Sequence, residues 1–231
     1  MMKTFTIAFL ILLFAIGLGL NFWWRQPSEY SPQFHQAQTG SLPYFLWADV
    51  SPIWANDPEY QAQKLMKLPE LVLKNQNNQM VSLHQGPQKI LILNFFFTSC
   101  GGFCPRQMAA LKPMAEKINQ ASPLYIYSIS VTPEQDQPSV LKKYAEKLGL
   151  SLSHWQLLTG DKKAIYAMAR QSLKADTEVD SGQTDQIFLH SEHLYLIDQR
   201  FFVRGIYNGN SPAALKQMQE DIGILMASSS F

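Results

Sequence analysis

Residues Ile90 to Phe97 form an apolar run that is interrupted only by Asn94. A run of this length without polar alternation is typical of a strand buried on both faces of a sheet. A helix is expected from about Pro105, because proline is favoured at the first helical position and an apolar stripe follows it. A buried strand that leads into a helix restricts the chain to folds in which helices cover a sheet.

The same alternation of strands and helices continues toward the C-terminus and predicts an α/β fold, in which a mixed sheet is flanked by helices. The other expected elements are a hairpin of residues 71–73 and 80–83, a strand over 124–131, helices over 138–148 and 161–173, a hairpin of residues 192–198 and 201–207, and a helix over 212–225.

Composition limits the size of the core and the classes of partner that the chain can bind. The chain has 231 residues and 46% hydrophobic content, enough for one core of ordinary domain size with length left over. Lys plus Arg (19) nearly balances Asp plus Glu (18). No broad basic field exists to attract nucleic acid, and we expect none as a partner.

The N-terminus is apolar and carries no charged residue from Thr4 to Leu20, and the apolar run continues to Trp24 before Arg25. This is about the 20 residues that a helix needs to cross a bilayer, with a Trp pair suited to the interface. A cleaved signal peptide is the alternative, but the run is long for one and no clear cleavage site follows. We predict one uncleaved N-terminal transmembrane helix.

The predicted organisation has three parts: a membrane anchor (residues 1–25), a tether and wrapping segment (26–67) and a domain (68–231). The short N-terminal side is expected to stay in the cytoplasm, which places the domain where disulfides can persist. In the second part, the aromatic residues are expected to pack against the domain: Tyr44, Phe45, Trp47 and Trp54.

Cys100 and Cys104 are the only cysteines, and they lie where the apolar strand gives way to the helix. Such a pair can chelate a soft metal, cycle between dithiol and disulfide, or close a loop. An inert structural disulfide is disfavoured, because so short a loop removes little entropy from the unfolded chain. The helix start is expected to favour a thiolate at Cys104. Gly101 and Gly102 allow the backbone between the two sulfurs to fold tightly.

Several separated motifs resemble the Sco/SenC family, whose members are membrane-tethered, thioredoxin-like copper proteins that serve assembly of cytochrome c oxidase. The resemblance covers about Leu68 to Leu225, with a further match from Leu42 to Trp54. The matching stretches are Phe97-Thr98-Ser99-Cys100-Gly101-Gly102-Phe103-Cys104-Pro105, Ser130 to Asp136, Leu141 to Ala145, Trp155 to Gly160, His190-Ser191 and Tyr195 to Asp198.

By this resemblance, Cys100 and Cys104 match the family's copper-binding cysteines and His190 matches its copper-binding histidine. Two thiolates and one imidazole form a soft set suited to Cu(I), and they can hold Cu(II) with an added weak ligand. His190 follows Cys104 by 190 − 104 = 86 residues, so only the fold can bring them together. The family usually has proline and an acidic residue where this chain has Gly101 and Gly102, and Asp where it has Leu189.

His193 is the rival for the third ligand, but its odd offset from His190 on a strand points it to the opposite face. The remaining candidates are expected to have structural roles: His35 in the tether, His84 in a turn, His154 as a partly exposed polar residue and Met108 as a core residue.

The resemblance implies a copper metallochaperone rather than an enzyme, held in the inner membrane by a single span with its domain in the periplasm. Copper would pass by ligand exchange to the dinuclear copper site of a copper-bearing cytochrome c oxidase subunit, or to another periplasmic cuproprotein. The alternative is a thiol-disulfide oxidoreductase that keeps a partner's cysteines reduced, with one cysteine attacking and the other resolving. The chain has no proline between Pro138 and Pro212, where thioredoxins carry a cis-proline, which disfavours a conventional reductase.

Overall fold

The computed structural model describes residues 41–54, 59–84, 89–118, 122–150, 154–175 and 191–228. The chain divides into two compact units, residues 1–34 and 35–231, and every described residue belongs to the second. Within these ranges no helix has both the length and the apolar character that a bilayer crossing requires. The predicted anchor over residues 1–25 lies outside the described residues.

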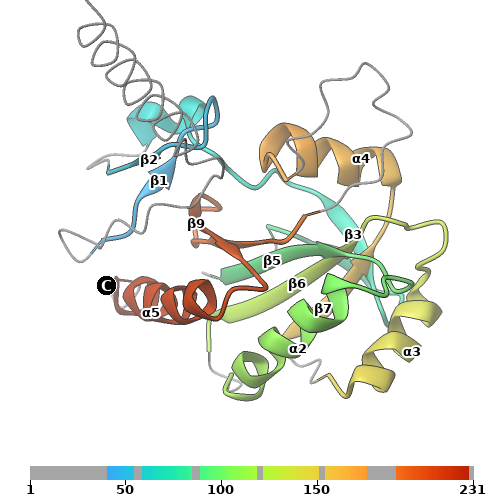
Figure 1. Cartoon of the computed structure of the whole chain (residues 1–231). Coiled ribbons are helices and arrows are strands. Elements are labelled where there is room, and N and C mark those ends of the chain that lie inside the picture. The colour runs from blue at the N-terminus through green and yellow to red at the C-terminus, as the bar shows by residue number, and fades with distance from the viewer. Residues whose placement is uncertain are drawn as a thin grey trace, which may run out of the picture. The chain divides into compact units, whose positions relative to one another are not determined.

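Seven strands form one mixed sheet, which confirms the predicted fold class (Figure 1). The central strand pairs are parallel, whereas the pairs toward both edges are antiparallel. In spatial order the strands are β4 (Met80–Ser82), β3 (Val72–Asn75), β7 (Trp155–Thr159), β6 (Leu124–Ser130), β5 (Ile90–Phe96), β8 (His193–Ile197) and β9 (Val203–Asn208).

Helices cover both faces of this sheet (Figure 1). One face packs against α2 (Phe103–Glu116), α3 (Pro138–Leu148) and α5 (Pro212–Ser228), and the other against α4 (Lys162–Ala167). Every residue of β5 is buried, and its side chains alternate between the two cores. The apolar run therefore behaves as its composition predicts, as a strand with no solvent face.

Three local features differ from the sequence prediction. Strand β7 was not expected. The helix expected over residues 161–173 is divided into α4, capped by the Asp161 side chain, and a π-helical turn at Met168–Ser172. Helix α2 begins at Phe103, so Pro105 occupies its third position, where a missing N–H leaves no intrahelical bond unmade.

The segment before β3 contributes a short hairpin, β1 (Tyr44–Phe45) with β2 (Pro52–Ile53), and a 3-10 helix at Glu59–Lys64. Tyr44 and Phe45 are buried, as expected. Trp47 and Trp54 are 45% and 41% exposed, so each is only partly covered. The Trp47 indole donates to the Gln171 carbonyl, and its ring meets the Lys174 amine 3.6 Å from its centroid, because a cation can rest on an aromatic face that is partly exposed to solvent.

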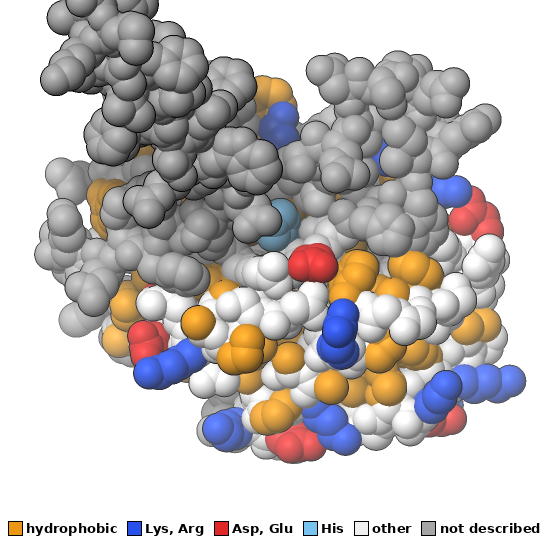
Figure 2. All heavy atoms as spheres, viewed as in Figure 1, with side chains coloured by type: hydrophobic (Ala, Val, Ile, Leu, Met, Phe, Trp, Pro, Cys, Tyr) orange, Lys and Arg blue, Asp and Glu red, His pale blue; other side chains and the backbone are white. Residues whose placement is uncertain are grey.

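Charged side chains of both signs are interspersed on the face shown in Figure 2, with apolar and uncharged surface between them. No large single-sign patch appears on the described part of that face. This distribution agrees with the near balance of 19 basic and 18 acidic residues.

Candidate metal centre

The two cysteines lie at the carboxyl end of β5. Cys100 is half-buried in the loop that joins β5 to α2, where its N–H donates to the Phe97 carbonyl at 3.2 Å. Cys104 is the second residue of α2 and is fully buried. Both thiols are free, and their side chains are hydrogen-bonded to each other. The loop therefore presents two adjacent sulfurs, one accessible and one covered.

Burial decides the protonation of the inner thiol. Desolvation, with a smaller contribution from Cys100, raises the pKa of Cys104 to about 12, although the N–H groups of Phe97 and Cys104 itself act in the opposite direction. The expectation that the helix terminus favours a thiolate at Cys104 is thus wrong for the metal-free protein. The dipole effect of a helix end is modest, whereas removing a charge from water is costly.

A buried carboxylate fixes the start of the cysteine loop. Asp136 is 1% exposed and accepts hydrogen bonds from the Thr98 N–H (3.1 Å) and hydroxyl, from the Ser130 hydroxyl (2.6 Å) and from the Thr132 hydroxyl (2.9 Å). Thr98 precedes Cys100 by two residues. Since four donors converge on one carboxylate, the backbone that leads to Cys100 is held to the end of β6.

A chain of buried polar side chains connects the sheet to the cysteine helix. The Trp155 indole donates to the Ser128 hydroxyl (2.9 Å), which donates to the side-chain oxygen Oδ1 of Asn94 (2.7 Å). The Asn94 amide then donates to Gln107 Oε1 (2.7 Å), and Gln107 Nε2 donates to the backbone carbonyl of Glu192 (3.1 Å). We refer to these five residues as the Asn94 network. Its last bond fastens Glu192 to α2 at Gln107, which follows Cys104 by three residues.

His190 lies outside the described residues, as does His35. Among the residues that the structure describes, no group of three His, Cys, Asp or Glu side chains could hold a metal ion. The described part of the candidate centre is therefore the Cys100–Cys104 pair, together with the fastened residue Glu192, which follows His190 by two positions.

The rival ligand His193 is the first residue of β8 and lies on the far face of the sheet. Its ring packs edge-to-face with Tyr195 at 6.0 Å, and Tyr195 belongs to the core on the α4 side. Leu194 and Cys104 belong to the opposite core, beneath α2. Burial lowers the pKa of His193. Strand alternation thus separates His193 from the two sulfurs.

The other sequence candidates have structural roles. Met108 is fully buried in the core, as expected, and His84 stacks on Phe201 at 3.8 Å with a ring nitrogen 2.8 Å from the Leu68 carbonyl. His154 is only 6% exposed, against the expectation of a partly exposed residue. It packs 4.7 Å from the Tyr125 ring, which covers it.

Tyr144 of α3 was missed as a site residue. Its ring centroid lies 5.6 Å from that of Phe96, at the end of β5. Its hydroxyl is buried without a hydrogen-bond partner among the described residues. Burial first, and then the charges of Cys104, Cys100 and Asp136, raise the pKa of Tyr144 to about 12. Helical periodicity could place Tyr144 on the inner side of its helix, but it could not predict that its buried hydroxyl is left unpaired among the described residues.

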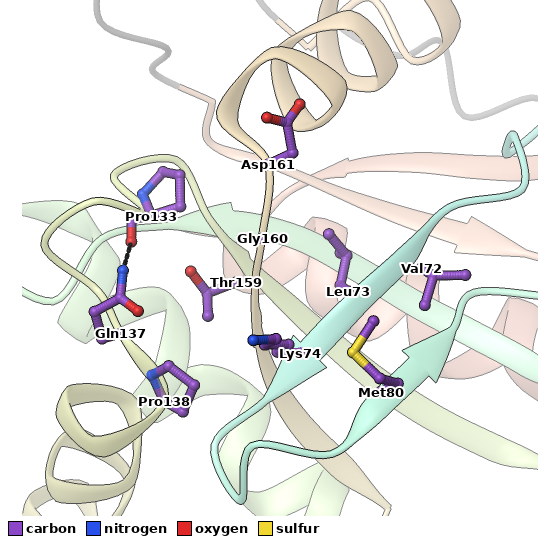
Figure 3. Close-up of a pocket in the computed structure, with 10 residues that line it drawn as sticks. All are labelled: Val72, Leu73, Lys74, Met80, Pro133, Gln137, Pro138, Thr159, Gly160 and Asp161. Carbon is purple, nitrogen blue, oxygen red and sulfur yellow. Dashed lines mark hydrogen bonds between the residues drawn. The ribbon is translucent and has the colours of Figure 1, made fainter.

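A separate pocket of about 330 Å³ opens between the β3–β4 hairpin and the start of α3 (Figure 3). Among the described residues, the buried Thr159 hydroxyl has no hydrogen-bond partner there, and Gln137 Nε2 donates to the Pro133 carbonyl at 2.7 Å. No cysteine or histidine is among its lining residues, so the soft-ligand chemistry lies elsewhere. The lining residues are Val72, Leu73, Lys74, Met80, Pro133, Gln137, Pro138, Thr159, Gly160 and Asp161.

Comparisons with known proteins agree with the fold. The SCO1 protein homolog of Bacillus subtilis (strain 168) is 34% identical over 143 residues, which are 60% of this chain and 73% of that protein. BsSco, a member of the Sco family of cytochrome c oxidase assembly proteins in which a disulfide switch has been identified, matches with a TM-score of 0.59 at 28% identity, over 71% of this chain and 95% of BsSco.

A more distant structure, Arabidopsis thaliana ScoI with copper bound, matches with a TM-score of 0.52 at 21% identity, over 72% of this chain and 99% of that one, and shows the shared fold. The family model described as SCO1/SenC matches residues 60–226, which contain both cysteines and the whole seven-stranded sheet. The chain therefore belongs to the SCO1/SenC family.

Proposed function

We propose that this protein is a copper metallochaperone in which Cys100, Cys104 and His190 hold one Cu(I) ion as cargo. Two thiolates and an imidazole are a soft, low-coordinate set that suits Cu(I), and an added weak ligand would let the same set hold Cu(II). Family membership supports the proposal, since BsSco belongs to a family of cytochrome c oxidase assembly proteins.

The hydrogen bond from Gln107 to the Glu192 carbonyl is the observation that carries the proposal. Gln107 is one helical turn from Cys104, and Glu192 is two residues from His190. The N–H of Gly209 donates to the same carbonyl at 2.8 Å, so two hydrogen bonds fix the position of Glu192. Because two residues of chain span at most about 7.6 Å, this anchoring supports a third ligand at position 190.

The described residues also suggest how the cargo is taken up and released. A Cys104 thiol with a pKa raised to about 12 keeps its proton near neutral pH, so copper must displace that proton on binding. The half-buried Cys100 is the sulfur that an incoming thiol can reach first. Copper can then move by ligand exchange, and no covalent catalysis is required.

The proposal includes the location and the recipient. Residues 1–25 would anchor the protein in the inner membrane, residues 26–67 would form the tether and wrapping segment, and the domain over residues 68–231 would face the periplasm. The recipient would be a copper-bearing subunit of cytochrome c oxidase or another periplasmic cuproprotein, whose cysteines accept Cu(I).

A second candidate is a thiol-disulfide oxidoreductase, and the unequal burial of the two cysteines favours it. The half-buried Cys100 fits the attacking thiol, and the buried, protonated Cys104 fits the resolving thiol. In this case the pair would reduce a partner's cysteines, and His190 would not bind a metal.

A Cu(I) titration of the reduced full-length chain against a competing chelator separates the two functions. The proposal predicts tight 1:1 binding that is weakened by about 100-fold in His190→Ala, and unchanged binding in the matched control His193→Ala. Equal affinities in wild type and His190→Ala would contradict the three-ligand site. Turnover of a model disulfide without Cu(I) binding would favour the oxidoreductase.

A further inference from the structure

The pocket between the β3–β4 hairpin and the start of α3 is separate from the cysteine centre (Figure 3). Its volume of about 330 Å³ lies within the range of small-molecule sites, which begins at about 300 Å³. Its lining includes Thr159, the last residue of β7, and Pro133, which follows the end of the parallel strand β6. Open α/β sheets bind their ligands outside the carboxyl ends of such strands. The position of the pocket is therefore typical of a ligand site.

Strand register places two polar side chains next to each other in this pocket. Lys74 of β3 and Thr159 of β7 are paired across antiparallel strands, so both side chains leave the same face of the sheet. Leu157 lies two residues before Thr159 and belongs to the core beneath α2 and α3, so this face is the α3 side. Lys74 is exposed and makes no hydrogen bond or ion pair with a described residue. The pocket therefore has an unpaired cation beside Thr159.

The Thr159 hydroxyl is buried and has no hydrogen-bond partner among the described residues. Thr159 as a whole is only 3% exposed. An unpaired buried hydroxyl costs free energy, and a ligand that accepts its hydrogen bond would remove this cost. The side chain extends from β7 toward Gln137 and Pro138 on the facing wall (Figure 3). Because Gln137 and Lys74 are exposed and exposed side chains change rotamer readily, a ligand can reach the hydroxyl by turning them aside.

The charges around the pocket favour an anion. A lysine amine carries donors only, and a hydroxyl can donate as well. Helix α3 begins at the same wall, and Gln137, its capping residue, makes no side-chain bond to the helix. The first turn of α3 has no acidic residue, so the positive end of the helix dipole is not neutralised there. Asp161 accepts a hydrogen bond from the Ala164 N–H at 2.7 Å, and its carboxylate points toward α4 and away from Lys74 (Figure 3).

The remaining walls of the pocket are apolar. Val72 lies two residues before Lys74 on the same face of β3, and Met80 is paired with Lys74 on β4. Val72 and Met80 are 48% and 61% exposed. Pro133 and Pro138 lie on the facing wall (Figure 3). An apolar group that enters the pocket would cover side chains that now face water, which is favourable.

We propose that this pocket binds a carboxylate that is attached to a short apolar group. The carboxylate accepts hydrogen bonds from the Lys74 amine and the Thr159 hydroxyl, and the apolar group packs between the hairpin and the two prolines. A free small acid and the terminal carboxylate of a polypeptide both have this chemistry. The inference does not rest on copper binding, because no cysteine or histidine lines the pocket.

Titration of the metal-free full-length chain with isocaproate tests the site, with isocaproamide as a neutral probe of the same shape. Binding is followed at ¹³C-labelled methionine methyl groups, because Met80 lines the pocket whereas Met218 of α5 is fully buried. The inference predicts a saturable shift at Met80 with a Kd of roughly 1 mM, an unmoved Met218, and about tenfold weaker binding of the amide. No saturable shift at Met80, or equal binding of acid and amide, would overturn it.

The role of the cation is tested with Lys74→Met, which removes the charge and keeps an unbranched side chain. This variant is expected to bind isocaproate about tenfold more weakly than wild type, at the level of the amide. The matched control is Lys216→Met, an exposed position on α5, which is expected to bind as wild type does. Unchanged binding in Lys74→Met, or an equal loss in Lys216→Met, would contradict the site. The titration of unaltered protein decides the matter where a variant folds poorly.

The role of the hydroxyl is tested with Thr159→Val. We expect isocaproate to bind about threefold more weakly, because one neutral hydrogen bond is lost. The melting temperature of the ligand-free variant is expected not to fall, since the hydroxyl has no partner to lose among the described residues. Wild-type affinity in Thr159→Val would remove the hydroxyl from the site. A lower melting temperature would show that the hydroxyl is already paired, which also contradicts the inference.

A peptide distinguishes the two sources of the carboxylate. Acetyl-Ala-Ala-Leu with a free carboxylate is compared with its carboxy-terminal amide and with isocaproate, which carries the same branched group. Tighter binding of the free peptide than of isocaproate, lost in the peptide amide, identifies a polypeptide terminus as the ligand. Equal or weaker binding of the peptide identifies a free small acid. If neither isocaproate nor the peptide moves Met80, the inference fails.

Discussion

Two buried polar regions lie on the same side of β5 and are organised in opposite ways. In the Asn94 network, Asn94 and Gln107 are fully buried and each bonds a side chain or carbonyl at either end. Around the dithiol, the Tyr144 hydroxyl has no hydrogen-bond partner among the described residues, and Cys104 keeps its proton because it is buried. The first region uses its hydrogen bonds to hold elements together, whereas the second contains polar groups that their described neighbours leave unpaired or protonated.

This difference separates a structural polar cluster from a functional one. A fully paired buried network rigidifies its surroundings, since breaking any bond leaves a buried group unsatisfied. A site that must accept an ion cannot be fully paired without it. The Asn94 network therefore sets the position of α2 and of Glu192. The two free thiols of the dithiol are the groups that can react or bind a metal.

The largest expected effect falls on metal binding at the dithiol. Cys104→Ser removes one of the two proposed sulfur ligands, and we expect Cu(I) affinity to fall by at least roughly 1,000-fold, more than the 10–100-fold typical of an outer-shell partner. The check is Cu(I) competition on the full-length chain, with Ser191→Ala as a control next to the proposed third ligand. Retention of wild-type affinity in Cys104→Ser would remove the dithiol from the metal centre.

The next effect falls on the stability of the Asn94 network. Asn94→Ala leaves Ser128 and Gln107 without their partners, and we expect the free energy of unfolding to fall by about 3 kcal/mol. Urea unfolding of the reduced protein measures it, with the exposed turn residue Asn77→Ala as control. A loss below about 1 kcal/mol would show that the network does not hold the core as we describe.

A pH effect is expected for the dithiol region and not for the Asn94 network, because its bonded side chains (Trp155, Ser128, Asn94 and Gln107) do not titrate and Glu192 takes part only through its backbone carbonyl. The pKa of Cys104 is about 12 in the folded protein, against 9.0 as its ordinary value. Between these pH values the folded state binds more protons than the unfolded state, so stability falls as pH rises. Urea unfolding across this window should show a steeper fall for wild type than for Cys104→Ser. Parallel profiles would contradict the burial of a protonated thiol.

The smallest expected effect concerns the cysteine loop. A Cβ atom at Gly101 would meet nothing within 4 Å, so Gly101→Ala should raise the free energy of unfolding by about 0.4–1 kcal/mol by restricting the unfolded chain. The contrasting variant is Gly149→Ala, where φ is +59° and an alanine is strained. Denaturant unfolding of both variants measures the difference. A destabilised Gly101→Ala would mean that the loop needs glycine at that position.

Local patterns predicted much of the fold. The uninterrupted apolar run at Ile90–Phe96 and the Pro138–Leu148 helix were predicted within a residue or two, because each is decided by its own periodicity. Strand β7 was not predicted, because it has only five residues and the sequence before it shows no clear helix or strand periodicity. The position of the cysteine pair followed from the strand and helix on either side of it.

The environment of the pair could not be predicted, because distant contacts create it. Gln107 and Glu192 are 85 residues apart, and Asp136 and Thr98 are 38 apart. No local pattern connects them. The same holds for Cys104, whose helix position predicted a thiolate while packing against the sheet produced a protonated thiol.

X-ray absorption at the copper edge tests the central claim most directly. The reduced full-length chain loaded with one equivalent of Cu(I) is compared with His190→Ala treated in the same way. We predict two sulfur scatterers and one nitrogen scatterer per copper in wild type, and loss of the nitrogen scatterer in His190→Ala. A wild-type spectrum with sulfur ligands alone, or with the nitrogen retained after the substitution, would contradict the proposed centre.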